Sequence, residues 1–147
     1  MAKDEIPAIR HYGRGDRVYV TAQRIWVILV ALVEAKRLPN WKPRPGKGAP
    51  TITYGELVQL INRSHLAGRT IRNELGIIGH YCRMNSLPCL NTLVVNQFGE
   101  CGESVVVSEG RDPAGDRREI MKIDWFAYGV PTTGTLRKVH SKFNVGH

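Results

Sequence analysis

Cysteine is scarce in this chain, and its few cysteines are not closely paired. Cys82, Cys89 and Cys101 are the only ones in 147 residues, and no two of them are separated by two residues. An odd, widely spaced set is not typical of a disulfide framework or of a structural zinc site, whose ligands come in close pairs. We therefore expect free thiols, no bound metal and a cytoplasmic location.

Long hydrophobic runs are also missing. The longest, Ile25–Val33, covers about nine residues, whereas a helix that spans a membrane needs about 20 apolar residues. Residues 1–10 contain acids and a proline, where a secretion signal would need a continuous apolar stretch. The sequence therefore predicts neither a membrane span nor a signal peptide.

Motifs of the common catalytic sites are absent as well. No glycine-rich phosphate loop follows a predicted strand, and no serine lies in a nucleophile elbow. Carboxylates can hold magnesium in a nuclease, and one segment crowds suitable residues together, although it also fits an ordinary charged loop: Asp112, Asp116, Glu119 and Lys122. We expect no catalytic residue and no small-molecule cofactor.

Acidic residues are the minority among the charged ones. Lysine and arginine outnumber aspartate and glutamate by 21 to 13, which gives a net charge of +8 and an isoelectric point near 9.8. Such a balance favours a polyanionic partner, because basic side chains release counterions from phosphates. The length fits a single domain over residues 1–147.

The N-terminal third divides into an arm, a helix and a loop. Residues 1–20 read as an arm or edge strand, and Thr21 can cap a hydrophobic core helix over 21–37. Its apolar surface is large enough to be buried on more than one side, against the domain, a partner protein or a second copy. Residues 38–50 form a proline-rich basic loop, which either links two elements or contacts nucleic acid through Lys42, Arg44 and Lys47.

The middle of the chain has the pattern of a helix-turn-helix. Thr53 and Glu56 form a capping box that begins a helix, which ends in a turn at 62–64. A second helix is expected from about residue 66 to residue 83, with one apolar stripe facing the core. Its opposite stripe recurs at spacings of three and four and is mostly polar: Arg69, Arg72, Asn73, Gly76, His80 and Arg83.

The segments that follow predict a small antiparallel sheet. Residues 91–95 and 104–107 flank a glycine-bearing turn, which is typical of a hairpin and, after a helix-turn-helix, of a wing. Within 108–130, residues 108–118 are expected to form a charged loop, and Ile120–Trp125, where apolar and polar residues alternate, a strand; the basic tail 131–147 is expected to be irregular. The fold class is therefore α+β, with a winged helix-turn-helix over 51–107 and an additional N-terminal hydrophobic helix.

This pattern suits non-catalytic binding of double-stranded DNA. A helix fits the major groove, where Arg69 and Arg72 can meet guanine and Asn73 can meet adenine. Arg63, Arg83 and the wing are expected closer to phosphates. His80 is expected on the same DNA-facing side of the helix, with Tyr54 supporting the helix. The alternative is an interaction subunit that docks a protein partner through its basic face, or a partner or homodimer through Ile25–Val33.

Four runs of this chain resemble the DNA-binding domain of alkylguanine-DNA alkyltransferases and their catalytically inactive alkyltransferase-like relatives. The runs lie within residues 51–107: Ile52–Leu57, Gly68–Leu75, Leu87–Cys89 and Val94–Gly99. The resemblance implies that Arg69 enters the duplex when a damaged nucleotide is flipped out and that Tyr54 lies near the phosphate of that nucleotide.

The resemblance ends at the alkyl-acceptor motif. The family has histidine and arginine directly after the reactive cysteine, whereas Cys89 is followed here by Leu90 and two extra residues precede Val94. A thiol needs a neighbouring base or cation to become the reactive thiolate. Non-catalytic binding is therefore the main expectation. A DNA-modifying enzyme, acting by alkyl transfer to Cys89 or as a metal-dependent nuclease, is kept as a second alternative.

Overall fold

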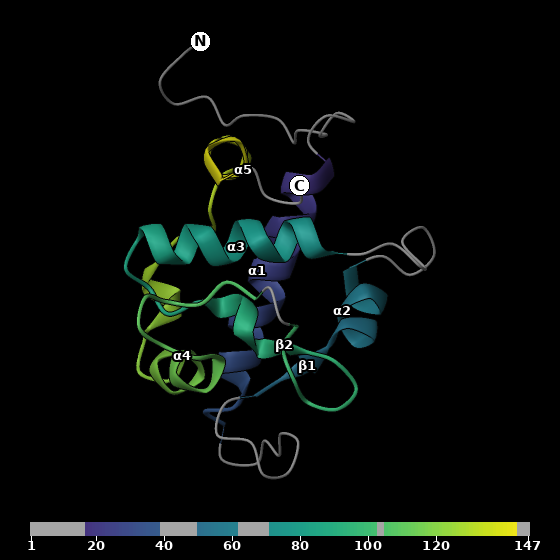
Figure 1. Cartoon of the computed structure of the whole chain (residues 1–147). Helices are drawn as coiled ribbons and strands as arrows, with labels where there is room; N and C mark the ends of the chain where they lie inside the picture. The colour runs from purple at the N-terminus through teal and green to yellow at the C-terminus, as the bar shows by residue number, and fades with distance from the viewer. Residues whose placement is uncertain (1–16, 39–49, 62–70, 103–104, 144–147) are drawn as a thin grey trace, which may run out of the picture.

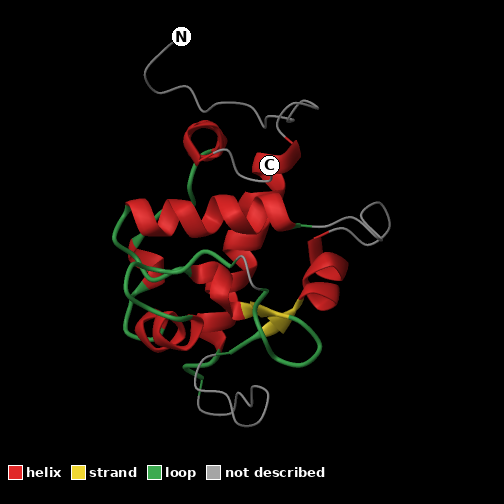
Figure 2. Cartoon of the chain, in the orientation of Figure 1, coloured by secondary structure: helices red, strands yellow, loops and turns green. Residues whose placement is uncertain are grey.

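The computed structural model of this chain describes residues 17–38, 50–61, 71–102 and 105–143, and predictions that concern other residues lie outside it. Helices dominate, and a very small sheet makes the fold α+β (Figure 1, Figure 2). In chain order the elements are α1 (Arg17–Ala35), β1 (Ile52–Thr53), α2 (Tyr54–Ile61), α3 (Arg72–Met84), η2 (Leu90–Leu93), β2 (Val94–Val95), α4 (Pro113–Ile120), η3 (Trp125–Ala127) and α5 (Thr133–Phe143).

Helix α1 is the centre of the core. Its buried side chains recur at helical spacing, so one face packs inward: Thr21, Ala22, Ile25, Trp26, Leu29, Val30 and Val33. Trp26 meets the rings of Tyr81 and Trp125 edge to face, with centroids 5.5 and 5.8 Å away. By length and composition alone α1 could also cross a membrane, a property that buried core helices share.

The start of α1 differs from the prediction. The helix begins at Arg17, so residues 17–20 are helical rather than part of an arm, and Thr21 is a buried residue inside the helix rather than its cap. Val18 and Tyr19 pack against the core, so the helix gains apolar contacts by starting a turn earlier than a cap at Thr21 would allow.

The sheet is parallel, and the predicted antiparallel sheet is wrong. Ile52 of β1 pairs with Val94 of β2, and Thr53 with Val95. The glycine turn after β2 does form, since Gly99 has φ +83° and Asn96 Oδ1 accepts the amides of Phe98 and Glu100. Residues 105–107 are irregular, and the strand that they were expected to supply is replaced by β1.

The predicted capping box at the start of α2 is confirmed. The Thr53 hydroxyl accepts the amide of Glu56 at 3.1 Å, and the Glu56 carboxylate accepts the amide of Thr53 at 3.0 Å. Leu57 and Ile61 then bury the inner side of this short helix.

Helix α3 lies in front of α1 in Figure 1. It also approaches the 91–106 segment closely. It begins at Arg72, and Ile71 is not helical, although the prediction included it in the helix. The predicted start near residue 66 lies outside the described residues. A Cβ atom at Gly79 would lie 2.7 Å from Cβ of Val106 and 2.9 Å from Oδ1 of Asn91. Glycine therefore allows a close approach that alanine would obstruct.

The C-terminal third is more helical than predicted. The expected loop 108–118 contains most of α4, whose cap Asp112 accepts the amide of Gly115 at 2.7 Å. The expected strand 120–125 is also wrong, because the chain turns so that the indole of buried Trp125 donates to the carbonyl of Ile120 at 2.9 Å. This hydrogen bond joins residues five positions apart, which an extended chain would separate by about 17 Å, so the segment cannot be a strand.

The predicted irregular tail contains helix α5. Its entry is held by Thr132, whose hydroxyl accepts the amide of Thr135 at 3.1 Å. Leu136 and Val139 bury one side of α5, which packs on both α1 and α3.

Candidate nucleic-acid interface

The structure describes half of the residues expected at the interface. Those described lie at the start of α2 and on α3: Tyr54, Arg72, Asn73, His80 and Arg83. The others lie outside the described residues: Lys42, Arg44, Lys47, Arg63 and Arg69.

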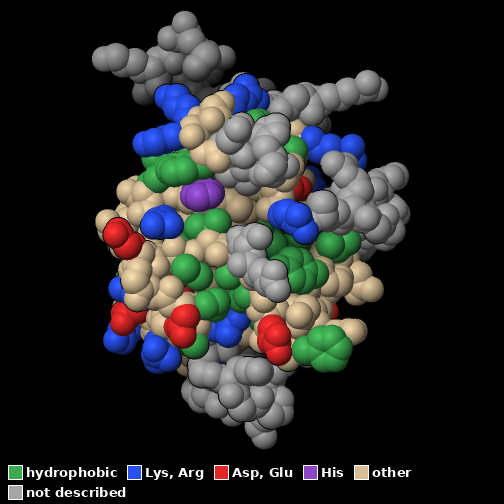
Figure 3. Space-filling view, in the orientation of Figure 1, with side chains coloured by type: hydrophobic (Ala, Val, Ile, Leu, Met, Phe, Trp, Pro, Cys, Tyr) green, Lys and Arg blue, Asp and Glu red, His purple; other side chains and the backbone are tan. Residues whose placement is uncertain are grey.

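One side of α3 is left open by the core. Arg72 and Arg83 are exposed, and Asn73, Gly76 and His80 between them are half-buried, whereas most of the remaining helix is buried. We call this side the α3 stripe: Arg72, Asn73, Gly76, His80 and Arg83. In Figure 3, Lys and Arg side chains lie near both ends of α3, with a histidine between them. The described part of the predicted stripe therefore shares one face.

Tyr54 lies beside the N-terminal end of the α3 stripe. Its hydroxyl lies beside the backbone of Gly102 and is close enough to Arg72 for the two groups to interact electrostatically. Burial raises the pKa of Tyr54, and the nearby Cys101 thiol adds to the rise. The phenol therefore stays protonated at neutral pH and can donate a hydrogen bond to an anion.

His80 joins the α3 stripe to α5. Its ring stacks on Phe143, with centroids 4.3 Å apart and an interplanar angle of 6°. Burial lowers the pKa of His80, and the Arg83 cation lowers it further. The ring is therefore mostly neutral at pH 7, so the charge of the stripe comes from its arginines.

Helix α5 adds cations that the sequence reasoning placed in an irregular tail. Arg137, Lys138 and Lys142 are exposed, and no acidic residue follows Asp124 in the chain. The Arg137 guanidinium lies 5.0 Å from the centroid of the Tyr19 ring, which holds it against α1. Figure 3 shows Lys and Arg side chains over α5 on the same face as α3.

A sequence signal for α5 was present. Thr132 stands where a helix cap would, and Leu136, Val139 and Phe143 recur at spacings of three and four. The amphipathic pattern is short and lies among basic residues, and it is the packing of Leu136 and Val139 against the core that makes it a helix.

Cys89 lies in the interior, behind α3. Its side chain is fully buried, and the thiol donates to the carbonyl of Gly79 at 3.5 Å. Burial, together with the nearby Asp116 carboxylate, raises the pKa of Cys89 to about 11, against smaller opposing contributions from Ser108 and Arg83. A thiol in this state is neither accessible nor ionised, so it has the properties of a small core residue rather than of a nucleophile.

The acidic segment around α4 is taken up by separate structural contacts. Asp116 is fully buried and accepts the amide of Ser108 at 2.8 Å and the guanidinium of Arg111 at 3.3 Å, while Glu119 pairs with Lys122 at 3.2 Å. Within the described ranges, no three His, Cys, Asp or Glu side chains are grouped so that they could hold a metal ion. This geometry gives a metal-dependent nuclease no support.

Comparisons with protein-family models, with curated proteins and with solved structures found no match for this chain.

Proposed function

We propose that this chain binds double-stranded DNA through the α3 stripe and the exposed cations of α5. The observation that carries the proposal is the side of α3 left open by the core: it is polar, and it has an arginine at each end. Arg137, Lys138 and Lys142 of α5 extend the positive charge beyond it. Phosphates are the partner that such a surface fits best.

The dimensions of α3 suggest how the helix would lie. Arg72 and Arg83 are about 16 Å apart along the axis at 1.5 Å per residue. Recognition helices usually contact base edges through their N-terminal residues, so we place the N-terminal end of α3 deepest in the major groove. With the N-terminal end inserted, Arg72 and Asn73 reach base edges, and Arg83 and α5 are left beside the phosphates.

The segment that follows β2 takes the place of a wing in this proposal. It returns to the N-terminal end of α3, where Gly102 contacts Tyr54, and its turn exposes the ring of Phe98. The resemblance to alkyltransferase-like domains assigns Tyr54 to a phosphate contact, and its protonated hydroxyl suits that role. Burial of Cys89 supports binding without alkyl transfer.

A polarisation titration of a labelled random-sequence duplex tests the proposal. The parent is expected to bind at about 50 mM salt and to lose affinity steeply by about 200 mM. The variant that combines Arg72→Ala with Arg83→Ala should bind about 10- to 100-fold more weakly, since each lost arginine contact is worth about 1 kcal/mol or more.

Arg24→Ala combined with Arg118→Ala is the matched control, because it also removes two exposed cations, which lie on α1 and α4 rather than on the α3 stripe. It should weaken duplex binding by less than about twofold relative to the parent, because distant exposed charges are screened by salt. Binding that does not depend on salt, or an α3 double variant that binds like the parent, would contradict the proposal.

A further inference from the structure

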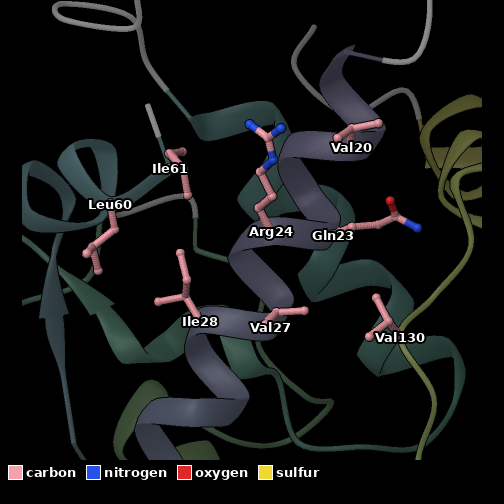
Figure 4. A pocket seen from close by; sticks show the side chains of 8 residues that line it. All are labelled: Val20, Gln23, Arg24, Val27, Ile28, Leu60, Ile61 and Val130. Carbon is pink, nitrogen blue, oxygen red and sulfur yellow. The ribbon is translucent and has the colours of Figure 1, made fainter. Parts of the chain in front are cut away.

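Helix α1 has a second apolar face that the core leaves largely open. Between it and α2 lies a groove of about 420 Å³ (Figure 4). Eight residues line the groove: Val20, Gln23, Arg24, Val27, Ile28, Leu60, Ile61 and Val130. On α1 the residues 20, 24, 27 and 28 project from the side opposite to the buried Ala22, Ile25 and Leu29, as helical periodicity requires.

The groove exposes several large apolar side chains together. Val27, Leu60 and Val130 retain 49%, 61% and 46% of their surface area in solvent. Single exposed apolar residues are common on protein surfaces, whereas contiguous ones lining a groove are typical of interaction sites. The wall formed by Val130 is fixed, because the Gln23 amide donates to the carbonyl of Pro131 at 2.9 Å.

Arg24 is the charged residue of this lining. Its side chain is exposed, and within the described part of the chain it takes part in no hydrogen bond or ion pair. None of the eight described residues that line the groove carries a carboxylate. A cation beside apolar walls therefore lacks a matching anion, which an occupant could supply.

We propose that this groove docks an amphipathic helix of another protein, with apolar side chains against Val27 and Leu60 and a carboxylate against Arg24. The groove walls come mainly from helices α1 and α2, and no strand edge lines the groove. Such a groove accepts a helix rather than an extended peptide. This interaction goes beyond DNA binding and uses a different face of α1 from the one that packs against α3.

Charge and shape disfavour other occupants of the groove. A second copy would bring two chains of net charge +8 together, and a two-fold axis through the groove would turn Arg24 toward its own equivalent. A small ligand is normally enclosed over about 70–90% of its surface, but half-exposed side chains such as Val27 and Leu60 leave this groove open. A helical partner buries its apolar face without needing enclosure.

Selection from a displayed library of random helical peptides tests the proposal, with the whole chain as bait. The parent should enrich peptides with large apolar residues at i and i+4 and with an acidic residue beside them. Bait carrying Arg24→Glu should instead enrich lysine or arginine at that position, because the charge of the groove is reversed. Arg118→Glu on α4 makes the same change in net charge at an exposed residue outside the groove, and it should select the same peptides as the parent.

The strongest peptide from the parent selection is then synthesised and its affinity measured. Leu60→Asp should weaken binding at least 10-fold, and because Leu60 is exposed the variant is expected to fold, as circular dichroism can verify. The proposal is overturned if no peptide is enriched, or if the Arg24→Glu bait selects the same acidic peptides. Two further outcomes would overturn it. If the parent is a dimer that Leu60→Asp dissociates, the occupant is a second copy; if the parent binds phosphatidylcholine vesicles and Leu60→Asp abolishes that binding, the occupant is a membrane.

Discussion

The α3 stripe and the outer face of α1 are two helix faces left open by the same core. The residues of each face recur at spacings of three and four, and each face is open because the opposite side of its helix is buried. Their side chains differ, since Arg72 and Arg83 bracket polar residues on α3, whereas Arg24 stands among apolar residues on α1. Periodicity shows which face is open, and side-chain chemistry indicates what each face can bind.

The open side of α3 depends first on how closely the opposite side of the helix packs against the 91–106 segment. Gly79→Val should lower the free energy of unfolding by about 3 kcal/mol, because the new side chain would overlap Val106 and Asn91. Gly55→Val is the control, since a Cβ at Gly55 meets nothing within 4 Å, and it should stay within about 0.5 kcal/mol of the parent. Urea unfolding measures both. Equal stabilities would mean that α3 does not approach the 91–106 segment as described.

Charge reversal on one face should separate the two activities. Arg72→Glu combined with Arg83→Glu is expected to weaken duplex binding by about 3 kcal/mol, since two attractive contacts become repulsive. The same variant should keep its affinity for a peptide selected on the groove, while Leu60→Asp should do the reverse. If either variant affects both ligands equally after folding is verified, the two faces are not independent.

A smaller effect is expected from α5. Lys138→Ala should reduce the slope of log affinity against log salt concentration by about 1, uniformly across DNA sequences, because it removes one phosphate contact. Polarisation titrations at several salt concentrations measure this slope. An unchanged slope would leave Lys138 outside the interface and restrict the interface to α3.

The smallest effect concerns pH. The pKa of His80 is lowered in the folded protein, so the unfolded chain binds more protons, and stability should fall as the pH drops below about 6.5. His80→Gln removes this titration and should lose less stability than the parent between about pH 7.5 and pH 5.5. Urea unfolding at the two pH values compares them, and equal losses would show that His80 does not contribute.

Local signals in the sequence predicted part of the structure well. The capping box of Thr53 and Glu56 and the open side of α3 both depend on residues three or four positions apart, so they can be recognised without knowing the rest of the fold. Gly79 is another local signal, because glycine weakens a helix and is therefore favoured within one where a neighbour needs the space.

Non-local pairing was not predictable in the same way. Strands of two residues carry no alternation, so nothing in Val94–Val95 indicates that its partner is Ile52–Thr53, before α2, rather than the valines after the turn. The alternation between Ile120 and Trp125 favoured a strand, but burial of the indole overrode it. For α4, the cap Asp112 followed by Pro113 was an available signal that the charge of the segment obscured.

The groove required the structure, although part of its origin was visible. The apolar surface of Ile25–Val33 indicated burial on more than one side, but only the placement of α2 and Val130 shows that the outer side is an open groove with Arg24 in it. Such a site combines residues more than 100 positions apart, and no local pattern links them.

Chemical-shift mapping of the isotope-labelled protein, titrated with a short DNA duplex, tests the central claim most directly. The largest changes are expected in the amides of the α3 stripe and of Lys138 and Lys142, and they should diminish at high salt. Amides of Val27 and Leu60 should stay unchanged. Changes centred on those groove residues, or none along α3, would contradict the account.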